Sequence, residues 1–232
     1  MNSINKTARF AGFLYLMMAP FAIFSIMYVP TILIEPGDAE ATANNIMASE
    51  GLFRSGIVSW LISQTIFVFL LLVLYKLLKP VNKNHALLMV VLALIAVPIA
   101  FINELNQFAV LLLLSGTDNL AAFEVEQLHA QAMFFLDLHA HGIYIAHMFW
   151  GLWLFPLAYL VFKSGFIPKI LGVLLMIGGF GYLIDFVTFT LFPNFDVTIS
   201  QFTGIGELLL PLWLLIKGVN VKQWEKCTLK SV

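Results

Sequence analysis

Cysteine and charge are both scarce in this sequence. The chain of 232 residues has one cysteine, Cys227, and charged residues make up only 11% of it. A single cysteine excludes an intrachain disulfide, a cysteine-based zinc site and a cysteine-ligated iron–sulfur cluster. The few Lys and Arg residues form no cluster with interleaved aromatic residues, so we do not expect nucleic acid as a partner.

Apolar residues take the place of the missing charges. They make up 61% of the chain, whereas a soluble domain is about half apolar and about a quarter charged. A soluble fold of this size could not hide so much apolar surface, because folded domains still expose a large part of their area. We therefore expect an all-α polytopic membrane protein whose solvent is the lipid bilayer, with residues 1–232 as a single transmembrane helical domain.

Long apolar runs predict where the chain crosses the membrane. A helix needs about 20 apolar residues to cross the hydrocarbon core, and the third run, which contains Pro98, is longer than that. The first run follows a basic N-terminal flank without a small-residue cleavage site, so we interpret it as an uncleaved span. The sequence thus predicts six transmembrane helices, at residues 10–29, 55–78, 86–114, 140–161, 170–192 and 200–216.

The distribution of cations predicts the orientation. With the N-terminus inside, eleven of the twelve Lys and Arg residues fall on cytoplasmic flanks, and only Arg54 falls in an outer loop. Short loops rich in Lys and Arg stay on the cytoplasmic side. Both termini are therefore expected in the cytoplasm, which requires an even number of spans. Two outer connections, 39–53 and 119–139, are also predicted to be helical; the second either extends the fourth span or packs as a separate interfacial helix.

Four acids fall within or beside the predicted spans. Ionisable side chains inside a membrane are costly and usually face the bundle interior or a water-filled cavity. On the predicted orientation, three of the acids lie in the outer half of the membrane and Glu207 lies nearer its middle. The four are Glu104, Asp137, Asp185 and Glu207.

The fourth span is rich in histidine. Residues three or four apart share a face of an α-helix, so Asp137, His141 and Tyr144 line up, and His147 lies on or beside the same face. His139 points to nearly the opposite side, and we leave it outside the predicted site.

His129 and His85 are interpreted as residues of the membrane interfaces and are also left outside. In the third span, Asn103 and Gln107 belong to a polar stripe beside Glu104. These features together predict an outward-facing intramembrane pocket for a small polar ligand or ion. Its residues are Asn103, Glu104, Gln107, Asp137, His141, Tyr144, His147, Asp185 and Glu207.

Three kinds of chemistry suit such a pocket. The preferred hypothesis is binding of a small polar ligand or ion. A metal-dependent membrane enzyme is an alternative, with a divalent metal on His141, His147 and Asp137; however, the two histidines are six residues apart and no His-Glu-x-x-His motif occurs. A proton-coupled transporter is a further alternative, although the polar residues reach the outer half only. The sequence does not set the oligomeric state.

The chain also resembles a known family over nearly its full length. The matching stretches include Ala11-Gly-Phe-Leu-Tyr-Leu16, Gly51-Leu-Phe-Arg-Ser-Gly-Ile57, Leu138-His-Ala-His-Gly142, Gly181-Tyr-Leu-Ile-Asp185 and Gly206-Glu-Leu208. On these residues it resembles the bacterial membrane proteins grouped as domain of unknown function 4386. The resemblance implies a multi-pass protein of the bacterial plasma membrane. It implies no activity and assigns no functional residue.

Overall fold

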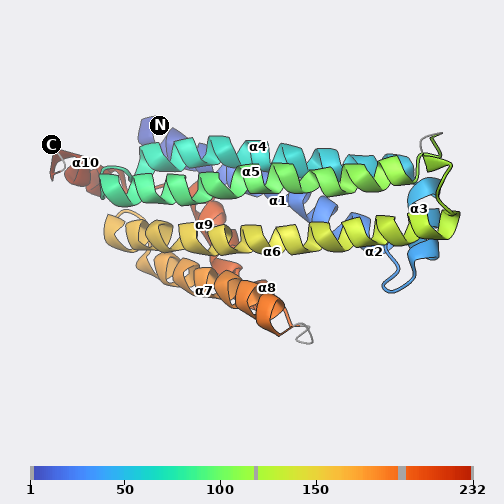
Figure 1. The fold of residues 1–232 in the computed structure, drawn as a ribbon. Helices are drawn as coiled ribbons and strands as arrows, with labels where there is room; N and C mark the ends of the chain where they lie inside the picture. Colours follow the sequence, from blue (N-terminus) through green and yellow to red (C-terminus); the bar gives the residue numbers. More distant parts are fainter. Residues whose placement is uncertain (1–2, 118–119, 193–196, 231–232) are drawn as a thin grey trace. The chain divides into compact units, whose positions relative to one another are not determined.

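The computed structural model describes residues 3–117, 120–192 and 197–230, and these residues form helices with no strand among them (Figure 1). In chain order the helices are α1 (Ser3–Ile23), the π-helix η1 (Phe24–Tyr28), α2 (Val29–Leu33), α3 (Ala39–Ala48), α4 (Glu50–Leu78), α5 (Lys83–Leu113), α6 (Val125–Ser164), α7 (Lys169–Leu191), α8 (Ser200–Thr203), α9 (Ile205–Ile216) and α10 (Val221–Lys230).

Most of these helices are long and apolar. Among the described residues, five helical segments are suited to cross a bilayer: Ser3–Leu33, α4, α5, α6 and α7. The pair Ser200–Ile216 and Val221–Leu229, bent by 101°, brings the number to six if it forms one span. The chain is therefore an all-α polytopic membrane protein, as its composition predicts.

The two helical connections predicted from the sequence agree with the structure in part. The segment predicted at 39–53 divides at Ser49, where α3 ends before α4 begins. Asp38 caps α3, because its Oδ1 accepts a hydrogen bond from the backbone N–H of Ala41 at 2.8 Å. In the segment predicted at 119–139, α6 begins at Val125 and continues without a break into the span, so this helix extends the fourth span; Asn119 lies outside the described residues.

Contacts divide the chain into two compact units. Unit 1 contains residues 1–17, 66–98 and 144–232, and unit 2 contains residues 18–65 and 99–143. Helices α1, α4, α5 and α6 each contribute one part to each unit. The single domain predicted for residues 1–232 stays a prediction.

Unit 2 has a hydrophobic core that joins its helices. Side chains from α2, α3, α4, α5 and α6 meet there, so the short helix α3 and the long helices bury a common apolar surface. The buried members are Val29, Leu33, Ile46, Phe53, Ile57, Val110, Leu111, Ala132 and Leu136.

Unit 1 contains the last four helices and holds the C-terminal segment by polar bonds. The backbone N–H of Val219 donates to Asn5 Oδ1 at 2.9 Å, and that of Asn220 donates to the carbonyl of Phe166 at 3.1 Å. The indole N–H of Trp224 on α10 donates to the carbonyl of Leu77, at the end of α4, at 2.9 Å. These bonds fix the start of α10 against three other segments of unit 1.

Candidate functional site

A polar stripe interrupts the apolar sequence of α5. Asn103, Glu104, Asn106 and Gln107 occupy four of five consecutive positions, and all except Asn106 are buried. Glu104 is only 1% exposed. Buried polar groups are stable only when hydrogen-bonded, so the partners of this stripe decide what it can do.

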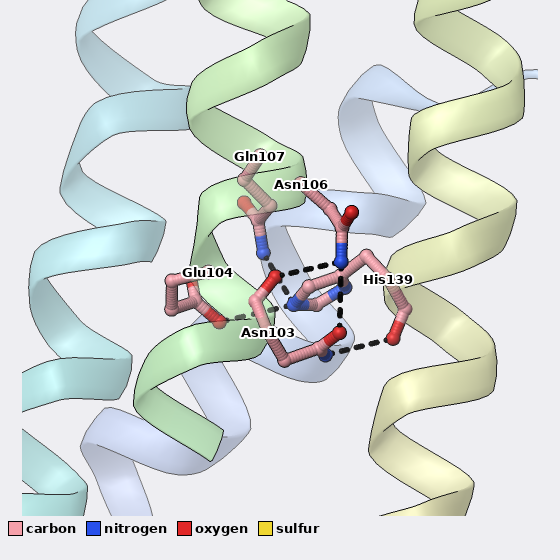
Figure 2. A network of polar contacts seen from close by, with 5 residues as sticks. All are labelled: Asn103, Glu104, Asn106, Gln107 and His139. Carbon is pink, nitrogen blue, oxygen red and sulfur yellow. Dashed lines mark hydrogen bonds and ion pairs between the residues drawn. The ribbon is translucent and has the colours of Figure 1, made fainter. Parts of the chain in front are cut away.

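The polar stripe of α5 contacts His139 of α6. Figure 2 shows the imidazole directed at α5, between the carboxylate of Glu104 and the carboxamide of Gln107. His139 Nε2 lies 3.0 Å from Glu104 Oε1 and 3.0 Å from Gln107 Nε2. The carboxylate and the imidazole form an ion pair whenever the histidine is protonated.

Two asparagines complete the network in Figure 2. Asn103 Nδ2 donates to the backbone carbonyl of His139 at 2.8 Å. Asn106 Nδ2 donates to the carbonyl and to the side-chain Oδ1 of Asn103, both at 3.0 Å. The close approach of Asn103 to α6 depends on Gly142, because a Cβ at that position would overlap the Asn103 carboxamide. We call Asn103, Glu104, Asn106, Gln107 and His139 the Glu104 cluster.

The 3.0 Å contact between Glu104 and His139 requires a hydrogen atom between the two groups. A ring nitrogen carries either a proton or a lone pair, so His139 Nε2 cannot donate to a carboxylate and accept from an amide N–H at once. If Nε2 carries the proton, it donates to Glu104 and the Gln107 amide turns its oxygen toward the ring. If Nε2 is an acceptor, the proton lies on Glu104 Oε1. In either arrangement one proton lies between Glu104 and His139.

The second carboxylate oxygen of Glu104, Oε2, takes no part in this network. Oε2 is buried and makes no hydrogen bond within the described part of the chain. A buried acceptor without a partner costs about 1–3 kcal/mol, and more when it is charged. A group that donates a hydrogen bond to Oε2 would recover this free energy.

Comparisons with known proteins identify the family. Residues 10–218 match the family model described as Domain of unknown function (DUF4386). The chain belongs to this family. The resemblance inferred from the sequence is thereby confirmed, and the family, as its description says, carries no assigned function.

A relative from the archaeon Archaeoglobus fulgidus, described as an uncharacterized protein, is 34% identical over 150 residues. The match covers 65% of this chain and 75% of the relative. No solved structure matches the chain.

Three residues of the predicted pocket, Asn103, Glu104 and Gln107, lie together around one histidine of α6. That histidine is His139, which bonds to all three and which the sequence analysis left outside the predicted pocket. The pocket itself stays a prediction. Helical spacing identifies which histidines share a face, but it does not identify the face of α6 that meets α5.

The other predicted residues of α6 in unit 2 lie elsewhere. The side chains of Asp137 and His141 are exposed, and His141 Nδ1 lies 2.7 Å from the backbone carbonyl of Asp137. His129, interpreted from the sequence as an interface residue, is instead buried at 8% exposure. The face that carries Asp137 and His141 is therefore distinct from the face that carries His139.

Four predicted residues belong to unit 1. Tyr144 stacks on Phe189, with 3.6 Å between ring centroids, and lies edge-on to His147 at 5.0 Å. Asp185 has a local structural role, because its two oxygens accept the backbone N–H groups of Ile199 and Ser200 at 2.6 and 2.9 Å.

The fourth residue, Glu207, accepts a hydrogen bond from the hydroxyl of Tyr15 at 2.8 Å. A single pocket formed by these four residues and the Glu104 cluster stays a prediction.

The metal hypothesis requires several ligand side chains close together. Within residues 3–117, 120–192 and 197–230, no group of three or more His, Cys, Asp or Glu side chains is placed to hold a metal ion. His141, His147 and Asp137 are therefore not such a group among the described residues. The Glu104 cluster offers one carboxylate and one imidazole together with carboxamides.

Proposed function

We propose that this membrane protein binds a small polar ligand or ion at the Glu104 cluster. The observation that carries the proposal is the buried Oε2 of Glu104, which has no hydrogen-bond partner among the described residues, while Oε1 lies 3.0 Å from His139. On the orientation predicted from the cations, Glu104 lies in the outer half of its span, so the ligand would arrive from outside. The membrane we propose is the plasma membrane of a prokaryotic cell.

The chemistry of the cluster favours a ligand that donates hydrogen bonds or carries positive charge. A carboxylate oxygen accepts and does not donate. The neighbouring carboxamides of Asn103 and Gln107 can present either an oxygen or an N–H group, so they can adapt to the rest of the ligand. Small ammonium compounds, monovalent cations and polyols meet these requirements.

Thermal unfolding of the purified protein in detergent tests the proposal. The probes are ammonium, sodium, potassium and glycerol, each titrated against wild type, Glu104→Gln and the control Glu126→Gln, which changes an exposed acid at the start of α6. A probe at about ten times its Kd adds about 1.4 kcal/mol to the free energy of unfolding. We expect at least one probe to stabilise wild type and Glu126→Gln but not Glu104→Gln. Equal responses of all three proteins to every probe would contradict the proposal.

Proton-coupled transport is the second candidate function, and the 3.0 Å contact between the carboxylate of Glu104 and the imidazole of His139 favours it. A carboxylate–imidazole pair that exchanges one proton is suited to a relay in a membrane. In proteoliposomes containing a pH-sensitive dye, transport predicts a proton flux that Glu104→Gln abolishes and Glu126→Gln preserves. The metal-dependent enzyme remains a third hypothesis. Elemental analysis of the purified protein tests it, since an enzyme of this kind requires stoichiometric metal that is lost in His141→Ala.

A further inference from the structure

Unit 1 contains a second carboxylate that is held by side chains from two other helices. Glu207 lies in the first turn of α9. Its Oε2 accepts a hydrogen bond from the hydroxyl of Tyr15 on α1 at 2.8 Å, and the hydroxyl of Tyr182 on α7 lies near the carboxylate. Tyr15 is 4% exposed, and Glu207 and Tyr182 are partly buried.

Two glycines bring the helices close enough for these contacts. A Cβ at Gly12, three residues before Tyr15, would lie 2.6 Å from the carbonyl oxygen of Pro211 on α9. A Cβ at Gly206, next to Glu207, would lie 2.7 Å from the backbone of Leu174 on α7. Small residues allow such close backbone approach in membrane helices. The positions of the two phenols around Glu207 are therefore set by the backbone packing of α1, α7 and α9.

Among the described residues, no cation lies beside Glu207 to compensate its charge. Its partners in the described structure are the two neutral phenols, and no lysine or arginine is among them. The other titratable groups nearby are Tyr144 and His147 on α6 and Asp185 on α7, and Asp185 is already bonded to two backbone N–H groups. His147 contacts the ring of Tyr182, with 5.2 Å between centroids, and its Nδ1 is buried without a hydrogen bond to any described residue.

An uncompensated carboxylate in a bundle of apolar helices costs several kcal/mol. Partial compensation comes from the phenol hydroxyls and from the N-terminal end of α9, where the helix dipole favours negative charge. A bound cation would remove the remaining cost. The smallest cation, the proton, needs no cavity and no change in the packing of the three helices.

We propose that Glu207 is a proton-binding site of unit 1, independent of the Glu104 cluster. In the unprotonated state both phenols donate to the carboxylate. A proton taken from water binds one carboxylate oxygen, and the new O–H group donates to the oxygen of one phenol, while the other phenol continues to donate to the carbonyl oxygen. Protonation thus reverses the direction of one hydrogen bond, and the contact between the helices is preserved.

Infrared difference spectroscopy of the purified protein across a pH titration tests this proposal. A protonated carboxylic acid has a carbonyl band that an ionised carboxylate lacks. We expect a pH-dependent band in wild type that disappears in Glu207→Gln and persists in Glu225→Gln, which changes an exposed acid on α10. Glu104→Gln should retain the band, so the outcome does not depend on the function proposed for the Glu104 cluster.

Two further variants separate proton binding from a merely structural hydrogen bond. Tyr15→Phe and Tyr182→Phe each remove one hydroxyl beside Glu207, so each should shift the frequency of the band without removing it. They also test the proposal if Glu207→Gln fails to fold. The proposal is overturned if the pH-dependent spectra of wild type and Glu207→Gln are the same, or if neither tyrosine variant moves the band.

Discussion

At the scale of one residue, Gly142 of α6 decides how closely Asn103 can approach. The Asn103 side chain occupies the space that a Cβ at position 142 would need, and its Nδ2 donates to the carbonyl of His139 one turn earlier. The cluster therefore depends on the absence of a side chain as much as on the polar groups themselves.

Gly142→Ala should destabilise the protein by about 1–3 kcal/mol, because the new methyl group displaces Asn103 and breaks its bond to His139. The matched control is Gly51→Ala, at the exposed start of α4, where a Cβ would meet nothing within 4 Å. There the loss of glycine flexibility should be neutral or stabilising by about 0.5–1 kcal/mol. Thermal unfolding in detergent measures both. Equal effects of the two substitutions would show that Asn103 does not need this space.

The Glu104–His139 pair is best measured by a double-mutant cycle. Glu104→Gln and His139→Ala each remove one partner of the 3.0 Å contact. We expect a coupling free energy of about 1–3 kcal/mol between the two substitutions, because each single variant leaves the other group buried without its charge-assisted bond. The same cycle with His141→Ala in place of His139→Ala serves as the control and should show coupling below about 0.5 kcal/mol. A coupling of that small size for His139 as well would indicate that the contact contributes little.

Residue identity alone singled out three of the five residues of this cluster. Glu104, Asn103 and Gln107 stand out because polar side chains inside an apolar span require partners. The partner itself was missed, since His139 was judged by its position relative to Asp137 and His141 on the same helix. Gly142 belongs to the stretch Leu138-His-Ala-His-Gly142, which resembles the family. Because a glycine allows another helix to pack closely, its place one turn after His139 could have indicated that the His139 face of α6 meets another helix.

At the scale of secondary structure, an acid of α7 organises the start of the next helix along the chain. Asp185 lies on α7, and its two oxygens accept the N–H groups of Ile199 and Ser200 at the start of α8. From sequence this residue was grouped with the pocket, because a buried carboxylate in a span gives the same signal whether it binds a ligand or caps a helix.

Asp185→Ala should loosen α8 and cost about 1–2 kcal/mol, the usual effect of removing a helix cap. Hydrogen exchange at residues 199–204 should speed up, because two backbone N–H groups lose their acceptors. Asp38→Ala removes the exposed cap of α3 and is the control; it should affect exchange at residues 39–42 and leave 199–204 unchanged. If Asp185→Ala leaves hydrogen exchange at residues 199–204 unchanged, Asp185 does not cap α8. Its carboxylate would then be available for the predicted pocket.

The long helices were predicted well and their ends were not. Hydropathy locates each span because the hydrocarbon core requires about 20 apolar residues. It does not decide that α6 is one helix of 40 residues, since the helical pattern predicted for residues 119–139 fits either an extension of the fourth span or a separate interfacial helix. It also gives no sign of the interruption at Gly204 between α8 and α9.

At the scale of the whole molecule, the central question is whether the chain crosses the bilayer five or six times. The cation distribution requires an even number of crossings, whereas the bend of 101° between Ser200–Ile216 and Val221–Leu229 leaves five helical segments that qualify alone. An odd number would place the termini on opposite sides of the membrane. The location of the C-terminus therefore decides between the two counts.

The only cysteine of the chain offers a direct test. Cys227 lies on α10, three residues after Trp224, and is partly exposed. With six spans, a membrane-impermeant thiol reagent should label it only after the cells are permeabilised. Ser3→Cys in a Cys227→Ser background should behave in the same way, because both termini would face the cytoplasm.

Asn44→Cys in the Cys227→Ser background is the outer control, since this exposed residue of α3 lies on the side where only Arg54 carries positive charge. It should react in intact cells. Labelling of Cys227 in intact cells, with Ser3→Cys still protected, would indicate five spans and an outer C-terminus. Labelling of both termini in intact cells would indicate that the orientation is the reverse of the predicted one. A ligand of the Glu104 cluster would then have to arrive from the cytoplasm.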